Sequence, residues 1–190
     1  LTLHGFYREP ANYYRTILPA VRGWVTAAGY SASTSVIVDE WNIGAEPPYP
    51  EGDLNSTFVD AAFTAASMLA MSEAGVDRQS FQMMVDPGGA GYYAGTNSVY
   101  GVPRANFQAT RLMSRLSGRK ISAVSSFPWV KTAASIDLDK VYVVTSVFAP
   151  TNLFLFRSLF DGLPISNLPA YRTIQGMSAS TVFGYIAGTK

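Results

Sequence analysis

The stretch Val36–Asn42, which reads Val-Ile-Val-Asp-Glu-Trp-Asn, decides the fold of this chain because it is an apolar strand ending on a carboxylate. Branched side chains fill its first three positions and turn-forming residues follow from 44 to 50, so the pattern predicts a buried strand. Glu40 then lies where the backbone leaves the sheet, and parallel strands flanked by helices carry catalytic groups at their C-terminal ends. A strand end also suits a glutamate that is only solvated, and this stretch alone leaves both interpretations open.

Composition narrows the classes of function. The chain has 190 residues, of which 48% are hydrophobic and 14% charged, with a net charge of +1. That is ample material for a core, and it gives no electrostatic reason to expect a nucleic acid or an anionic membrane as partner. The chain has no cysteine and a single histidine, His4, so we expect no disulfide, no metal site and no cofactor. No apolar run approaches the roughly 18 residues that a membrane span needs.

Leu1 is followed at once by strand-like sequence, and no signal peptide is visible. We therefore expect that the true N-terminus lies further upstream and that the protein is secreted. The glycosylation triplet Asn55-Ser56-Thr57 is a weak pointer in the same direction.

The first part of the chain alternates strands and helices. Alternating apolar residues predict strands at 1–7, 36–41 and 79–86, the last of which ends on Asp86. Apolar residues at steps of three and four predict helices at 11–30, 55–74 and 104–116. We expect Pro19 to bend or divide the first helix, Asn55 or Ser56 to cap the second, and Gly118 to end the third. Phe58 is expected on the apolar side of the second helix. This order predicts parallel strands joined by crossover helices.

The pattern changes after residue 118. Short β-type runs at 120–126, 131–136, 141–148, 153–160 and 181–187 are separated by turn residues, which is typical of an antiparallel sandwich. We predict two domains, 1–118 and 119–190. Three strand–helix units cannot close an eight-stranded barrel, and an open three-stranded parallel sheet would need helices on both faces. We therefore expect the chain to be part of a larger fold. The predicted fold is α/β: strands six to eight of a (β/α)8 barrel, followed by an antiparallel β-sandwich.

The three strand ends would converge in such a barrel. They carry His4 and Tyr7, then Glu40 with Trp41 and Asn42, then Asp86. A carboxylate beside hydroxyl and imidazole donors suits nucleophilic attack on a sugar, and an aromatic ring suits its apolar face. His4 as a structural hydrogen-bonder and Asp86 as a cap of the following loop are the alternatives. The tyrosines Tyr92, Tyr93 and Tyr100 either line a saccharide cleft or pack ordinarily, and Met83 and Met84 are expected in the core.

The chain resembles retaining glycoside hydrolases of clan A. Residues 1–7 are similar to a strand six that often reads Ser-x-His-x-Tyr, and Val-Asp-Glu-Trp-Asn at 38–42 resembles the strand-seven signature of family 39, the β-xylosidase and iduronidase group, and of family 51, the α-L-arabinofuranosidases. Asp60-Ala61-Ala62 and the run 101–107, followed by Leu112 and residues 116–118, favour family 39. The resemblance covers residues 1–118 well and 119–190 only as general architecture.

The resemblance implies that Glu40 is the nucleophile and that His4, Tyr7, Trp41, Asn42 and Asp86 bind an oligosaccharide or polysaccharide. The family's acid/base glutamate follows an asparagine on strand four, and no Asn-Glu pair occurs in this chain. Asp86, Glu9 and Glu46 could take the acid/base role in principle, but all three lie on or beyond the predicted strand ends. We therefore expect a second polypeptide or an upstream segment to complete the barrel, and we expect this chain alone to be inactive. The alternative is a non-catalytic carbohydrate-binding or structural relative.

Overall fold

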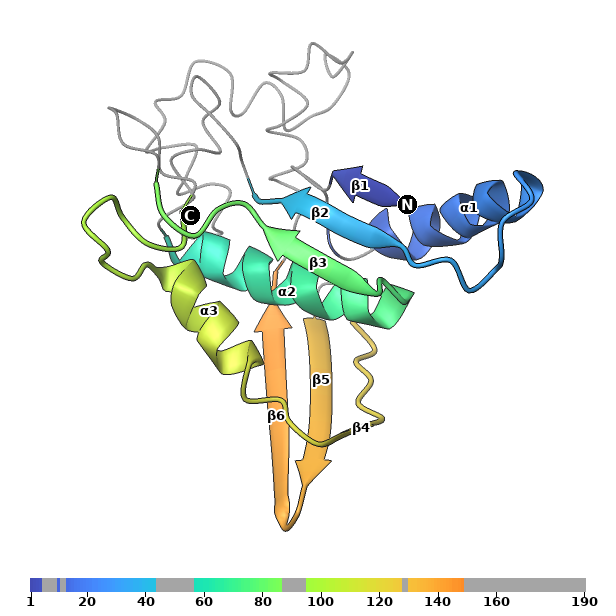
Figure 1. Cartoon of the computed structure of the whole chain (residues 1–190). Coiled ribbons are helices and arrows are strands. Elements are labelled where there is room, and N and C mark those ends of the chain that lie inside the picture. Colours follow the sequence, from blue (N-terminus) through green and yellow to red (C-terminus); the bar gives the residue numbers. More distant parts are fainter. Residues whose placement is uncertain (5–9, 11–12, 44–56, 87–94, 128–129, 149–190) are drawn as a thin grey trace, which may run out of the picture.

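The structure is a computed structural model that describes residues 1–4, 10, 13–43, 57–86, 95–127 and 130–148. Its elements follow the predicted order of strand and helix, and then of strands alone (Figure 1). They are β1 (Thr2–His4), α1 (Tyr13–Ala27), β2 (Ile37–Trp41), α2 (Phe58–Ala74), β3 (Arg78–Phe81), α3 (Ala105–Met113), β4 (Arg119–Ile121), β5 (Val130–Asp137) and β6 (Lys140–Val147).

The first sheet has the order β1-β2-β3, and both pairings are parallel. This confirms the prediction of parallel strands with crossover helices. The third strand is shorter than predicted and ends at Phe81. The backbone of residues 83–86 turns instead to residues 96 and 97, as the bonds from Thr96 N–H to the Met83 carbonyl (2.8 Å) and from Asp86 N–H to the Asn97 carbonyl (3.1 Å) show.

Helix α1 is a single helix although Pro19 lies inside it. Its buried residues recur at helical spacing on both sides of the proline, so packing against the core holds the two halves together; they are Tyr14, Leu18, Val21 and Val25. Gly29 ends the turn that follows at a positive φ of 83°, as the sequence predicted.

Helix α2 begins one residue later than the predicted caps allow. Its N-cap is Thr57, whose hydroxyl accepts a hydrogen bond from Val59 N–H at 3.2 Å, and its C-cap is Gly75 at φ 82°. The expectation for Phe58 was wrong, since this side chain is 62% exposed. The core side of α2 runs through Val59 and Phe63, and Phe58 lies about 100° around the helix from that line.

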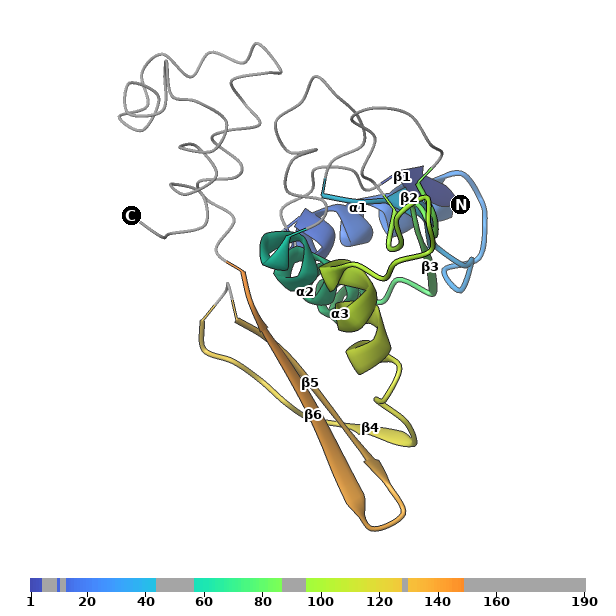
Figure 2. The same cartoon turned by 90° about the vertical axis from the view of Figure 1, so that its left-hand side faces the viewer.

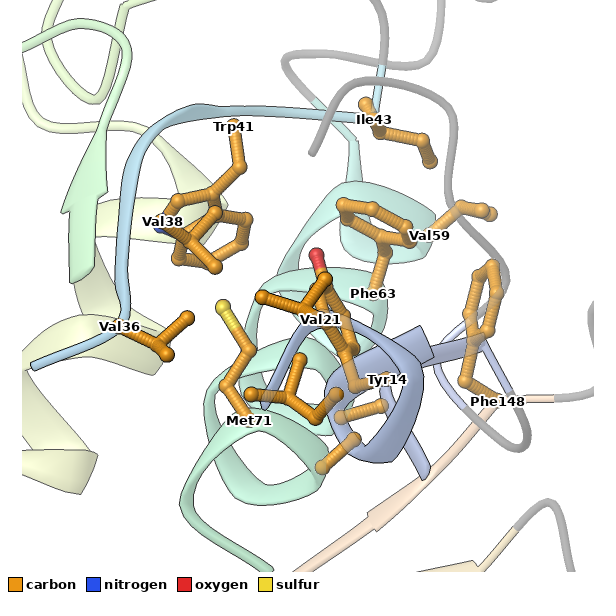
Figure 3. Packing of buried hydrophobic residues seen from close by; sticks show 13 residues of the cluster. Tyr14, Val21, Val36, Val38, Trp41, Ile43, Val59, Phe63, Met71 and Phe148 are labelled. Carbon is orange, nitrogen blue, oxygen red and sulfur yellow. The ribbon is translucent and has the colours of Figure 1, made fainter. Parts of the chain in front are cut away.

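The core lies between β2 and the two long helices (Figure 3). Val36, Val38 and Trp41 come from β2 and its N-terminal edge, Tyr14 and Val21 from α1, and Val59, Phe63 and Met71 from α2. Aromatic rings fill its centre: Trp41 meets Phe81 edge to face at a centroid distance of 4.9 Å, and Phe63 meets Phe148 at 5.5 Å. Both helices therefore cover the same face of the parallel sheet.

The second sheet has the order β4-β5-β6 and is antiparallel. It packs on α2, where Ser146 donates to the Ala62 carbonyl at 2.8 Å and Lys131 pairs with Glu73 at 2.9 Å (Figure 2). Strand β4 is shorter than the predicted run 120–126, while β5 and β6 match their predicted runs within about a residue at each end. The runs 153–160 and 181–187 lie outside the described residues, so the sandwich and the boundary at 118 stay predictions.

In the part of the chain that the structure describes, no helix combines the length and the apolar character that a membrane span requires.

Candidate functional site

Glu40 lies beside β1 at the carboxyl end of the parallel sheet. In the strand register Leu3 is opposite Val38 and His4 is opposite Glu40, so Asp39 is an extra residue with no partner position on β1. The register towards β3 is interrupted at the same place. Residue Asp39 therefore forms a β-bulge, a device that re-aims the side chains that follow it.

The bulge turns Glu40 away from the helices. Successive side chains of a strand point to opposite faces, so Val36 and Val38 share a face and Glu40 would share it as well in a regular strand. Trp41 instead joins Val36 and Val38 in the core. The extra residue at Asp39 has shifted the alternation by one, and it places half-buried Glu40 on the face opposite the helices.

Trp41 differs from its predicted role. Its side chain is 1% exposed and packs between Phe63 and Phe81, with ring centroids 6.3 and 4.9 Å away. An indole buried in this way offers no face to a sugar ring. The physical reason is again the bulge, which sends the residue after Glu40 into the core.

Asn42 also lies inside the structure, with an exposure of 0%. Its Nδ2 donates to the Gln82 carbonyl at 2.6 Å, and its Oδ1 accepts from the Ile43 N–H at 2.6 Å. Both ends of the amide are therefore engaged by backbone. Asn42 joins the chain that leaves β2 to the chain that leaves β3, and so fixes the backbone next to Glu40.

Asp86 holds the glycine-rich loop rather than facing an open site. One carboxylate oxygen is paired with Arg104, and the other accepts from the Gly95 N–H at 2.8 Å. Asp86 is buried, and a Cβ added to Gly95 would lie 2.6 Å from the backbone nitrogen of Asp86. The close approach of these two backbone segments therefore requires glycine at position 95. Of the two predicted roles, the described contacts match the one in which Asp86 fastens the loop.

Replacing Asp86 by Asn tests this role. The amide keeps an acceptor for Gly95 but leaves the Arg104 guanidinium without its charged partner, and the loss is expected to be about 2 kcal/mol of unfolding free energy. Urea denaturation of Asp86→Asn, Arg104→Met and the double variant measures it. A coupling energy near zero in this cycle would show that the pair contributes nothing.

A buried polar cluster between α2 and α3 was not foreseen. Asp60, Thr64 and Ser67 recur at helical spacing on α2, and together with Asn106 of α3 all four have an exposure of 0%. Thr64 donates to Asp60 Oδ1 at 3.2 Å, while Asp60 Oδ2, Ser67 Oγ and Asn106 Nδ2 lack a hydrogen bond of good geometry among the described residues. The sequence signal was available as a polar stripe within an otherwise apolar helix.

Burial raises the pKa of the Asp60 carboxyl well above its ordinary value, and Thr64, Asn106 and the charge of Arg104 offset this only in part. A carboxyl whose pKa is higher in the folded state binds more protons there. The stability linked to Asp60 is thus complete below the unfolded-state pKa and is lost as the pH rises towards the folded-state value.

Asp60→Asn should therefore raise the Tm at pH 7, and its advantage should shrink as the pH falls towards the ordinary range of a carboxyl pKa. Thermal unfolding followed by circular dichroism across this range measures the effect. Asp139→Asn, in the exposed β5–β6 turn, is the matched control and should show no such trend. A pH-independent difference between Asp60→Asn and the parent would contradict the assignment.

Several predicted site residues fall outside the described residues. These are Tyr7 and the loop tyrosines Tyr92 and Tyr93, and the rejected acid/base candidates Glu9 and Glu46 lie outside them as well. His4 is placed by its backbone alone, and Tyr100 is 89% exposed. Within the described ranges no group of three His, Cys, Asp or Glu side chains could hold a metal ion.

Comparisons with known proteins find the fold but not a family. No protein-family model matches the chain, and no curated protein matches it. Among solved structures, a glucosidase from Croceicoccus marinus matches with a TM-score of 0.64 at 21% identity over 81% of this chain, and a GH39 β-xylosidase from Caulobacter crescentus with a TM-score of 0.56 at 19% identity over 74%. A GH39 enzyme from Xanthomonas axonopodis pv. citri has a TM-score of 0.56 at 14% identity over 74% of this chain.

The chain spans about a third of the length of these structures, since it covers 33%, 30% and 31% of them respectively. The likeness establishes that the described α/β part has the fold of a portion of GH39-like glycoside hydrolases.

Proposed function

We propose that this chain is the C-terminal portion of a retaining glycosidase. In this proposal β1, β2 and β3 are strands six to eight of a (β/α)8 barrel, and Glu40 is the nucleophile. The observation that carries it is the bulge at Asp39, which turns Glu40 to the face opposite the helices, beside His4 in the strand register. In a closed barrel that face is the interior, and catalytic groups lie at the carboxyl ends of the strands.

The chemistry is a double displacement. A Glu40 carboxylate oxygen attacks the anomeric carbon while a partner acid protonates the departing glycosidic oxygen, and water then releases the sugar with the partner acting as base. The partner carboxyl belongs about 5–5.5 Å from Glu40 in a retaining enzyme. The chain has no Asn-Glu pair to supply it, so the proposal places it on a preceding segment or a second polypeptide.

The predicted substrate contacts divide into two groups. His4 and Tyr7 stay proposed as donors to the sugar or to Glu40. Asn42 and Asp86 are better explained as positioning residues, because backbone groups and Arg104 occupy their polar atoms. Trp41 has no proposed contact with substrate, since it lies in the core.

A slow covalent substrate tests the proposal directly. A 2-deoxy-2-fluoro β-xyloside or β-glucoside with a dinitrophenolate leaving group reacts readily to form the glycosyl-enzyme. Water then hydrolyses this glycosyl-enzyme only slowly, so the covalent adduct accumulates. We expect the complete enzyme to gain one sugar, and peptide mapping to place it on Glu40. An adduct on another carboxylate would refute the assignment, and turnover of unfluorinated glycosides without any adduct would argue against a retaining mechanism.

The second candidate is a carbohydrate-binding or structural relative without hydrolytic activity. The commitment of Trp41, Asn42 and Asp86 to packing and backbone contacts favours it, because three of the expected substrate contacts then serve the structure itself. This candidate predicts saccharide binding, or none, but no adduct with the fluorinated glycosides.

A further inference from the structure

A short hairpin lies beyond the end of β3, with its arms bridged in antiparallel orientation between Asn97 and Pro103. We term it the Tyr100 hairpin. The Gly101 N–H donates to the Ser98 carbonyl at 2.8 Å, and Gly101 has a φ of 74°. This combination is typical of a three-residue hairpin loop, whose last position takes a positive φ. Tyr100 therefore lies at the tip of a closed turn.

The Tyr100 hairpin is anchored on the chain that leaves β3. The Met84 carbonyl accepts hydrogen bonds from the Asn97 N–H and Nδ2, at 3.0 Å each, and from the Thr96 hydroxyl at 2.9 Å. The Asp86 N–H donates to the Asn97 carbonyl at 3.1 Å, and Arg104, which follows the second arm, pairs with the Asp86 carboxylate. Both arms are thus held in place, so the entropy of ordering the tip is lost on folding and not on binding a ligand.

The side chains at the tip are left to solvent. Tyr100 is almost fully exposed, and its neighbours Val99 and Val102 are exposed as well. Met84, at the base of the hairpin, is 76% exposed, so its expected place in the core was wrong. The reason is that β3 ends at Phe81, which leaves Met84 in the turned chain beyond the strand. Exposed apolar side chains gathered in one place mark a contact site.

The Tyr100 hairpin leaves the sheet at the edge that carries Glu40. Strands β2 and β3 are parallel neighbours, so the chain beyond β3 and the end of β2 share one edge. Figure 1 shows this arrangement, with the yellow-green loop before α3 on the side to which both strands point. In the proposed barrel that edge is the catalytic face, so a long substrate bound at Glu40 extends over the loops of this face.

The composition of the hairpin suits a neutral sugar. Residues 95–103 read Gly-Thr-Asn-Ser-Val-Tyr-Gly-Val-Pro and include no charged side chain. The side chains of Thr96, Asn97 and Ser98 are bonded to backbone groups, which leaves the ring of Tyr100 as the main group that the tip offers. A phenol ring has an apolar face and a polar end, as a pyranose ring has an apolar face and a rim of hydroxyls. A stable protein partner would need about 800 Å² on each side, more than one ring on a narrow turn presents.

We propose that Tyr100 is the stacking platform of an outer subsite, which binds a neutral sugar unit of the same saccharide chain whose scissile bond lies at Glu40. The substrate class is then an oligosaccharide or polysaccharide long enough to reach both residues, and not a disaccharide. The inference rests on the proposed function and specifies the substrate of that site.

Binding to the complete protein carrying Glu40→Gln tests the subsite without hydrolysis. Isothermal titration calorimetry with xylohexaose and cellohexaose, and with xylobiose and cellobiose, gives the affinities. We expect Tyr100→Ala to weaken binding of a hexaose by about tenfold and to leave the disaccharides unchanged. Tyr100→Phe, which keeps the ring, should bind like the parent. Equal hexaose affinities in Tyr100→Ala and the parent would overturn the proposal, as would an equal loss for the disaccharides or no binding of either hexaose.

Tyr30→Ala is the matched control. Tyr30 is also an exposed tyrosine, but it lies between α1 and β2, at the opposite edge of the sheet. Its removal should leave hexaose binding unchanged, and a loss equal to that in Tyr100→Ala would contradict the subsite. Sedimentation velocity tests the other occupant of the tip, a second copy of the chain. An oligomer that dissociates on Tyr100→Ala would overturn the proposal.

A fluorinated xyloside or glucoside separates this proposal from the assignment of the nucleophile. Such a small glycoside does not reach an outer subsite, so Tyr100→Ala in the otherwise unchanged enzyme should still form the adduct on Glu40. Failure of the subsite in the binding experiment then leaves Glu40 standing. Absence of the adduct in parent and variant alike removes the reaction centre to which the subsite belongs, and would overturn both proposals.

Discussion

Glu40→Gln is expected to reduce glycoside hydrolysis by the complete enzyme by about 10⁴-fold or more, the scale on which enzymes lose kcat when a covalent nucleophile is removed. Glutamine keeps the shape of the side chain but cannot attack the anomeric carbon. Since Glu40 lies at a strand end and outside the core, the variant should fold like the parent. Aryl β-xylosides and β-glucosides, with release of the phenol followed by absorbance, provide the assay.

Asp39→Asn is the matched control, because Asp39 is the exposed neighbour of Glu40 on the bulge. Its amide should leave kcat within a few-fold of the parent, an effect that is small on the scale of the Glu40 change. Unchanged turnover in Glu40→Gln, with circular dichroism showing a folded protein, would end the proposal. Equal losses in both variants would point to a general electrostatic effect instead of a nucleophile.

Trp41→Ala is expected to cost about 3–5 kcal/mol of unfolding free energy, the usual range for removing a large buried aromatic side chain. The indole is 1% exposed and touches rings from both α2 and β3, so its removal leaves a cavity at the centre of the core. Typical domains are stable by only about 5–15 kcal/mol. Urea denaturation followed by circular dichroism at 222 nm gives the difference in unfolding free energy.

Trp24→Ala is the control for this variant, since it removes the same side chain from a position that is 63% exposed. Its cost to the chain should be about 0.5 kcal/mol or less, as for most surface substitutions. Similar losses for the two tryptophans would mean that Trp41 is not in the core, and the stacking role expected from the sequence would then return.

The sequence predicted the elements of the first sheet because each carries a strong period and a terminator. Branched residues define β2, and glycines end α1 and α2 where the backbone needs a positive φ. Glu40 could be selected as a candidate for the same reason, as the carboxylate at the end of a buried strand. The approximate place of a strand end is encoded locally, so pattern alone finds it.

The roles of the neighbouring residues could not be predicted in the same way. A bulge depends on how two strands pair, and the sequence Val-Asp-Glu-Trp does not indicate that Asp39 is the residue without a partner on β1. Hence Trp41 was placed beside a sugar when it packs in the core. Asp86 and Arg104 are 18 positions apart, and no local pattern in the sequence indicates that their charges meet.

The bulge at Asp39 has a consequence for how this strand tolerates change. The identity of residue 39 is only loosely constrained, because its side chain is exposed. Deleting that one residue would leave Val38, Glu40 and Trp41 in regular alternation, with the carboxylate still on the face opposite the helices and the indole still in the core. Loss of residue 39 would therefore remove the bulge from the strand without changing the faces on which Glu40 and Trp41 lie.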